Sequence, residues 1–151
     1  MMDDLRDLYQ EVILDHGRRP RNFSAMAGAS SKAEGFNPLC GDKVTVYVKM
    51  DGDRIGSLSF QGSGCAISTS SASLMTERLK GMSKPEAEAL LGRFQAMVTS
   101  DPASPLPEGL GKLEALGGVR EYPMRVKCAT LAWHTLKAAL VEKPGATVST
   151  E

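Results

Sequence analysis

The chain has 151 residues, of which 42% are hydrophobic and 24% charged. This length and composition predict one soluble domain and exclude a chain that is disordered throughout. Lysine and arginine number 18, as do aspartate and glutamate, and the resulting net charge of zero argues against a general nucleic-acid binder. No apolar run approaches the roughly 20 residues needed to cross a bilayer. The acidic start, residues 1–7, lacks the features of a secretory signal, so we expect a cytoplasmic protein without membrane partners.

The first part of the chain predicts a helix followed by a small sheet. Apolar residues recur at three- and four-residue steps from Leu5 to His16, and Gly17 suits the end of such a helix. An initial edge strand before Cys40 is expected to complete a sheet of about three antiparallel strands. The other expected segments are a basic arm at 18–23, a loop or irregular edge at 24–34, and strands at 44–50 and 54–61 joined by a turn at 51–53.

The second part of the chain predicts helices. Ser83 and Glu86 form a capping box around Pro85. The expected helices cover 65–80, 84–98, a short stretch through Leu110, Leu113 and Leu116 that is closed by Gly117-Gly118, and a last helix from Pro123 to about Glu142. Helices that follow an antiparallel hairpin indicate an α+β fold. We therefore expect a single domain over 1–142 and a flexible C-terminal tail over 143–151.

Each of the three cysteines lies at a structural break. Cys40 precedes Asp42 in a turn shaped by proline and glycine, Cys65 follows Gly62-Ser63-Gly64 at a helix start, and Cys128 lies near the start of the last helix. A helix N-terminus and nearby cations both favour the thiolate form. Three thiolates and the Asp42 carboxylate would supply the four ligands of a tetrahedral zinc site. The alternative is that these are buried cysteines at tight turns.

Three ordered motifs resemble the IscU/NifU-N iron–sulfur cluster assembly family. They are N-P-x-C-G-D at 37–42, G-x-G-C-A-I-S at 62–68 and R-x-K-C-A-x-L-x-W at 125–133. Cluster scaffolds of the IscU type carry histidine immediately before the third cysteine, where this chain has Lys127. This difference, and the long stretch between the second and third cysteines, resemble the SufU branch.

The resemblance implies an IscU-like fold and a role in sulfur transfer. The implied protein is a zinc-dependent acceptor of persulfide sulfur from a SufS-type cysteine desulfurase, for delivery to downstream iron–sulfur scaffold proteins. The resemblance assigns the acceptor role to Cys40 and makes Arg125 a cation that steadies the released thiolate. The implied metal ligands are Cys40, Asp42, Cys65 and Cys128. Any sulfurtransferase-like activity would require the desulfurase.

Two other functions stay open at this stage. The same four residues could hold an iron–sulfur cluster that is built and passed on, or the zinc site could serve a structural interaction domain. Lys127 has a possible role beside the ligands, although a solvated lysine is an equal alternative. His16 and His134 have no evident pairing with a thiol, which argues against a cysteine protease. The arginines of the arm, Arg18, Arg19 and Arg21, are hypothesised to contribute to the desulfurase-docking surface.

Overall fold

The computed structural model describes residues 2–141 and 146–149, with side chains over 9–140. The elements in chain order are α1 (Met2–Arg18), β1 (Ser31–Asn37), β2 (Asp42–Asp51), β3 (Arg54–Ser63), α2 (Ala66–Leu79), α3 (Lys84–Val98), the 3-10 helix η1 (Gly111–Glu121), α4 (Pro123–Val141) and β4 (Ala146–Ser149). A helix, an antiparallel sheet and then further helices confirm the predicted α+β class.

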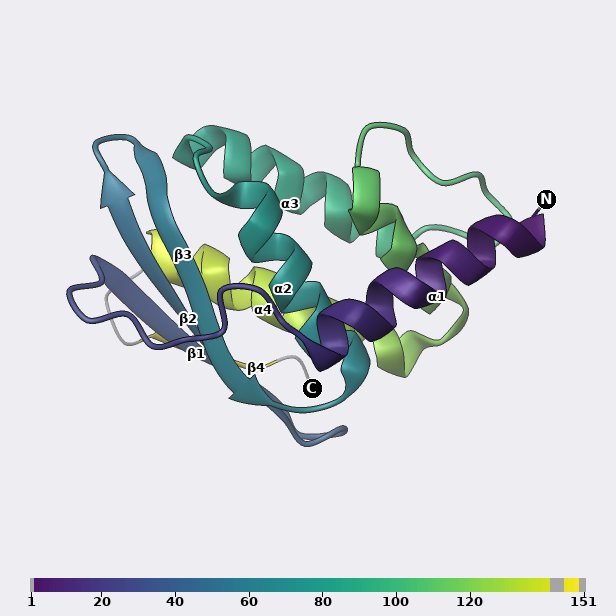
Figure 1. Cartoon of the computed structure of the whole chain (residues 1–151), viewed down its shortest axis with the longest axis horizontal. Coiled ribbons are helices and arrows are strands. Elements are labelled where there is room, and N and C mark those ends of the chain that lie inside the picture. Colours follow the sequence, from purple (N-terminus) through teal and green to yellow (C-terminus); the bar gives the residue numbers. More distant parts are fainter. Residues whose placement is uncertain (1, 142–145, 150–151) are drawn as a thin grey trace.

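The sheet is built around β2, which pairs antiparallel with β1 on one side and β3 on the other. Figure 1 shows this sheet beside the helices; the strand order is β3-β2-β1-β4, with β4 parallel to β1. On β2, Val44, Val46 and Val48 are buried and the residues between them are more exposed, because successive side chains point to opposite faces of a strand. One face of β2 therefore packs against the helices.

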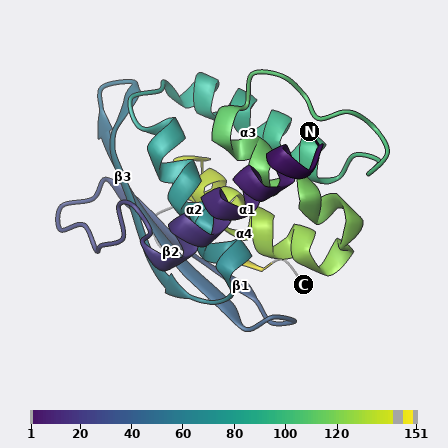
Figure 2. The ribbon, with the colours of Figure 1, turned by 45° about the vertical axis from the view of Figure 1, so that its right-hand side comes forward.

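Two helices cover that face of the sheet. Helix α4 packs on β1 and β2, and α2 packs on β3 and also contacts α1 and α4. Figure 2 shows α1 crossing in front of α2 and α4. The buried residues of α2 include Ser70, Ser71 and Ser73, whose small side chains allow this close packing. Trp133 of α4 donates from its indole nitrogen to Ser71 Oγ at 3.0 Å and stacks on Phe94, so α4 is fixed relative to both neighbouring helices.

The structure confirms several short sequence patterns that predicted helix starts and turns. Ser83 Oγ accepts from the Glu86 N–H at 3.3 Å, and the Glu86 carboxylate accepts from the Ser83 N–H at 3.2 Å, which completes the predicted capping box. The apolar stripe of α3 is buried and consists of Ala87, Leu90, Leu91, Phe94, Met97 and Val98. Gly52 in the β2–β3 turn has a φ of 65°, the left-handed conformation that glycine adopts without steric cost.

Two predicted boundaries are wrong. Strand β1 confirms the strand expected before Cys40, but it begins at Ser31, inside the segment 24–34 that we interpreted as a loop or irregular edge. Its inward positions include Ala33 and Gly35, so the strand lacks the large apolar residues that signal burial. The short helix does not close at Gly117-Gly118 but continues as η1 to Glu121. A Cβ at Gly117 would collide with the Leu106 side chain, so this glycine provides room for packing instead of ending the helix.

The expected tail falls partly outside the described residues. Ala146–Ser149 form β4, which pairs with the edge of β1, whereas 143–145 and 150–151 are not described. Pairing with β1 explains why these four residues form a strand, since the edge of a strand presents N–H and C=O groups that a further strand can satisfy. Within 2–141 and 146–149, no helix has the length and apolar character that crossing a bilayer requires.

Candidate metal centre

Two connections and the first part of α4 bring the cysteines to one end of the sheet. Cys40 lies in the β1–β2 turn, Cys65 in the β3–α2 connection and Cys128 in the second turn of α4. In Figure 1 the β1–β2 turn and the β3–α2 connection both lie at the lower end of the sheet. Asn37 ends β1 and Asp42 begins β2, and the two residues pair in register. Both are buried, on the same face as the inward residues of their strands.

One oxygen of the Asp42 carboxylate is held by a hydrogen bond, and the other oxygen faces the thiols. Its Oδ1 accepts a hydrogen bond of 2.9 Å from the backbone N–H of Cys65. Its Oδ2 lies 4.0 Å from Cys65 Sγ. Gly64 lies directly against this carboxylate, and a Cβ at that position would collide with Oδ1. The glycine before Cys65 is therefore needed for the close approach of backbone and carboxylate.

The thiols lie around that carboxylate. Cys40 Sγ and Cys128 Sγ are 3.3 Å apart, and the ligand atoms of Cys40, Asp42 and Cys128 lie within 4.8 Å of one another. Cys65 is the N-cap of α2 and accepts from the Ser68 N–H at 3.4 Å. It is not part of the three-residue group, although it approaches Asp42. The structure thus brings three predicted ligands together and places the fourth beside them.

The donor set fits a tetrahedral zinc ion. Zinc takes thiolate sulfur at about 2.3 Å and carboxylate oxygen at about 2.0–2.2 Å. A tetrahedron with these bond lengths separates two sulfurs by about 3.8 Å, and a sulfur and an oxygen by about 3.6 Å. The 3.3 Å between Cys40 and Cys128 and the 4.0 Å between Cys65 and Asp42 are within about 0.5 Å of these separations. Cys40, Asp42 and Cys128 are therefore close enough to hold one ion, and Cys65 lies beside them.

Asn37 is a site residue that the sequence analysis did not identify as one. It is fully buried, and its Nδ2 lies 3.3 Å from Asp42 Oδ2 and 3.4 Å from Cys128 Sγ. Its Oδ1 is buried without a hydrogen-bond partner. Inward positions alternate along β1 and include Ala33 and Gly35. A polar amide at the next inward position was the signal that could have identified Asn37.

The electrostatics of the centre differ between its buried and open sides. Burial, followed by the hydrogen bonds with Cys40 and Asp42, raises the pKa of the Cys128 thiol above its ordinary range. Arg125 is exposed, and its pKa is raised chiefly by a hydrogen bond to Cys128 and next by the charge of Cys65. A buried thiol becomes a thiolate only when a cation stabilises the charge. Arg125, predicted as such a cation, lies at the exposed side of the thiols.

Other residues singled out in the sequence have structural partners. His16 is buried, with Nδ1 2.7 Å from Ser73 Oγ and Nε2 3.6 Å from the Glu77 carboxylate. Arg21 of the basic arm pairs with the Asp15 carboxylate at 2.7 Å, and its backbone N–H donates to Ser73 Oγ. Neither His16 nor His134 belongs to the group of potential ligands found among the described residues. Arg21 therefore attaches the arm to α1 and α2.

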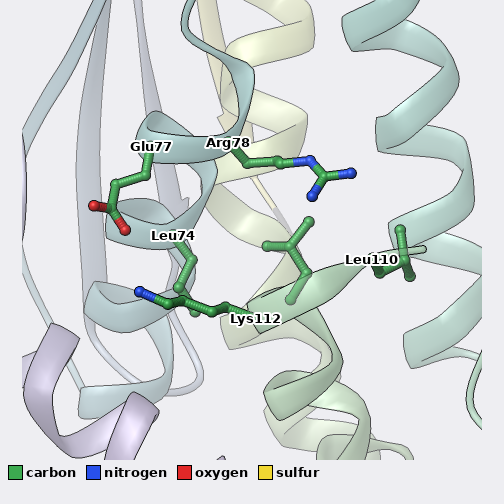
Figure 3. Close-up of a pocket in the computed structure, with 6 residues that line it drawn as sticks. Leu74, Glu77, Arg78, Leu110 and Lys112 are labelled. Carbon is green, nitrogen blue, oxygen red and sulfur yellow. The ribbon is translucent and has the colours of Figure 1, made fainter. Parts of the chain in front are cut away.

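A shallow pocket of about 190 Å³ lies apart from the cysteines. Figure 3 shows Leu74, Glu77 and Arg78 of α2 on one side, and Leu110 and Lys112 at the start of η1 on the other. Leu74 is nine residues beyond Cys65, which corresponds to about 13 Å along a helix axis. The pocket therefore does not form part of the candidate metal centre.

Comparisons with known proteins agree with the motifs. A family model described as the NifU-like N terminal domain matches residues 8–148. The iron-sulfur cluster assembly scaffold protein IscU of Streptococcus pyogenes serotype M1 is 42% identical over 139 residues, which cover 92% of this chain and 86% of that protein. The zinc-dependent sulfurtransferase SufU of Bacillus subtilis is 37% identical over 142 residues, which cover 94% of this chain and 95% of that protein.

Solved structures agree with the fold as well. A putative iron-sulfur cluster assembly scaffold protein for the SUF system from Fervidobacterium islandicum AW-1 has a TM-score of 0.79 and 37% identity. The similarity covers 86% of this chain and 94% of that one. The matched family range contains all three cysteine motifs, and the structure brings those motifs together. The chain therefore belongs to the NifU-like N-terminal domain family, which includes the IscU and SufU proteins of iron–sulfur cluster assembly.

Proposed function

We propose that the chain is a zinc-dependent sulfur acceptor of the SufU type that works with a cysteine desulfurase. The observation that carries the proposal is the unequal anchoring of the ligands. Asp42 and Cys128 are buried, whereas Cys40 and Cys65 are both partly exposed. Cys65 caps α2 and accepts from the Ser68 N–H, whereas Cys40 lies in the β1–β2 turn. The Asp42 carboxylate is held by a backbone N–H, and Cys128 lies within a regular helix. Cys40 is thus the ligand best placed to leave the centre and meet a partner.

The chemistry that follows is a transfer of sulfur between two cysteines. When bound, zinc holds the thiols as thiolates at neutral pH. The Cys40 thiolate attacks the outer sulfur of a persulfide on the desulfurase. A bond forms between Cys40 Sγ and that sulfur, the sulfur–sulfur bond of the donor breaks, and the donor cysteine leaves as a thiolate. The proton stays on the transferred sulfur, and there is no net oxidation or reduction.

The remaining residues keep the centre intact during this exchange. Asp42, Cys65 and Cys128 would hold the metal without Cys40, so that the Cys40 thiolate would be free to react. Arg125 lies at the exposed side of the thiols, where its charge stabilises the departing Cys40 thiolate. The name of the Bacillus subtilis relative, a zinc-dependent sulfurtransferase, supports this function.

A second function has support from another relative. The Streptococcus pyogenes protein is named a cluster assembly scaffold, and in such a role an iron–sulfur cluster would be the cargo of the same four residues. Lys127 favours the acceptor, because the family resemblance places a histidine before the third cysteine in cluster scaffolds of the IscU type, and this chain departs from that pattern. A protonated lysine is a poor metal ligand, which leaves Asp42 as the fourth ligand.

Metal content separates the two functions. The acceptor predicts about one zinc per chain and no visible absorption in protein purified without added metal, whereas iron with matching sulfide would favour the scaffold. With desulfurase and cysteine, Cys40→Ser should abolish sulfur acceptance and lose less zinc than Cys128→Ser, which removes a buried ligand. Undiminished sulfur acceptance in the Cys40 variant would contradict the proposal.

A further inference from the structure

The side chain of Asn37 connects two candidate ligands that come from different elements. Its Nδ2 lies 3.3 Å from Asp42 Oδ2 on β2 and 3.4 Å from Cys128 Sγ on α4. A carboxamide nitrogen carries two hydrogens, so each ligand can receive one. Asn37 and Cys128 are 91 residues apart in the chain. One amide therefore spans the contact between the sheet and the helix that carries the buried thiol.

The backbone of Asn37 supports the same centre. It pairs in register with Asp42 across the β1–β2 turn. Its carbonyl oxygen accepts a hydrogen bond of 3.3 Å from the Cys40 N–H. Asn37 thus contacts the side chains of the two buried ligands, Asp42 and Cys128, and the main chain of Cys40.

The orientation of the amide follows from the charges of its neighbours. Reversing the amide would turn Oδ1 toward the Asp42 carboxylate, which only accepts, and toward Cys128, which would also only accept when a metal holds it as a thiolate. The donating nitrogen therefore faces the ligands. Oδ1 then stays buried without a partner. A buried acceptor without a partner lowers stability, and an apolar residue of similar size would avoid that loss. The donor toward the ligands is the feature that distinguishes asparagine at this position.

We propose that Asn37 is a positioning residue of the metal centre. Its amide holds Asp42 Oδ2 and Cys128 Sγ at ligand spacing and reduces the repulsion between their negative charges. Because it restrains these two side chains, they keep their places when Cys40 leaves. The inference rests on the proposed metal site, and groups that hold metal ligands from outside typically change metal affinity by 10- to 100-fold.

The test replaces the amide and measures metal binding directly. Asn37→Asp keeps the shape but replaces the donor with an acceptor, and Asn37→Ala removes the group. Ser59→Ala is the matched control, because Ser59 Oγ is the other buried side-chain atom without a hydrogen-bond partner in the described chain, and it lies on β3. Zinc affinity is measured by competition with a chromophoric chelator, and ligand geometry by the absorption spectrum of the cobalt(II)-substituted protein.

We expect both Asn37 variants to bind zinc about 10- to 100-fold more weakly and to show an altered cobalt spectrum. The Ser59 variant should match the wild type in both measurements. Wild-type affinity and an unchanged cobalt spectrum in folded Asn37 variants would overturn the inference and leave only a structural role. A wild-type protein that binds no zinc would instead refute the proposed function, so the two failures are distinguishable.

A measurement on the wild type covers the case in which the variants do not fold. In isotope-labelled protein, the Asn37 side-chain amide protons should shift and exchange slowly with water when cadmium is bound at the thiols. Exchange as fast as that of an exposed asparagine, with no shift on addition of cadmium, would overturn the inference.

Discussion

Replacing Gly64 with alanine should weaken metal binding although Gly64 donates no ligand. Its φ lies outside the left-handed region, so the backbone accepts alanine, and the obstacle is contact alone. The new Cβ would collide with Asp42 Oδ1 and lie 3.0 Å from the carboxylate carbon. Asp42 must then move away from the Cys65 N–H, which donates to it at 2.9 Å.

The size of the effect follows from that hydrogen bond. A hydrogen bond to a charged group contributes about 1.5–3 kcal/mol. Each 1.4 kcal/mol corresponds to a tenfold change in a binding constant, so zinc affinity should fall by about 10- to 150-fold. Gly92→Ala is the matched control, since Gly92 lies in α3 with nothing within 4 Å of its added Cβ. An alanine there should raise the free energy of unfolding by about 1 kcal/mol and leave zinc affinity unchanged.

Chelator competition on both alanine variants gives the comparison. Zinc affinity in Gly64→Ala equal to that of Gly92→Ala would refute the reasoning, because it would mean that the position of Asp42 does not matter for metal binding. Cobalt(II) spectra identify the cause of any loss of zinc affinity. A changed ligand field indicates a displaced carboxylate, whereas an unchanged field with lower occupancy indicates general destabilisation.

Two further predictions concern side chains beside and away from the centre. In metal-free protein, Arg125→Gln should slow alkylation of the Cys40 thiol at neutral pH, because the thiolates lose a neighbouring cation. Arg125→Lys keeps the charge and should retain most of the alkylation rate. Equal rates in the wild type and both variants would count against Arg125 as the stabilising charge. Burial, and next the charge of Arg21, lower the pKa of His16, so the unfolded chain takes up its proton at a higher pH than the folded one. The free energy of unfolding should therefore fall as pH drops below the unfolded value of about 6.5. His134 contributes in the same direction. Urea unfolding of metal-free His16→Asn should show a shallower pH dependence than the wild type, and an unchanged slope would contradict the assignment.

Helices and strands with a clear periodic pattern or a capping motif could be predicted from the sequence. The β2 valines alternate with more exposed residues, and Ser83 with Glu86 closes a capping box, so periodicity and spacing were sufficient. β1 was harder, since its inward residues are small or polar. Strand β4 depends on pairing with β1, a contact that its own sequence does not encode.

The residues that could hold a metal were easier to recognise in the sequence than the residues that support them. Cysteines at turns and helix starts, with Asp42 nearby, were visible in the sequence. The contact of Asn37 with Cys128 spans 91 residues, and it depends on the packing of α4 against the sheet, which no local pattern describes. The function of Gly64 likewise became clear only when Asp42 was seen against it.

The most direct test of the account locates the transferred sulfur. Zinc-loaded protein is incubated with a cysteine desulfurase and cysteine, persulfides are trapped by alkylation, and peptides are mapped by mass spectrometry. If Cys40 is the acceptor, one added sulfur is expected on the peptide that contains Cys40, and none on the peptides of Cys65 and Cys128. Sulfur on either of those two cysteines while Cys40 stays unmodified would contradict the account.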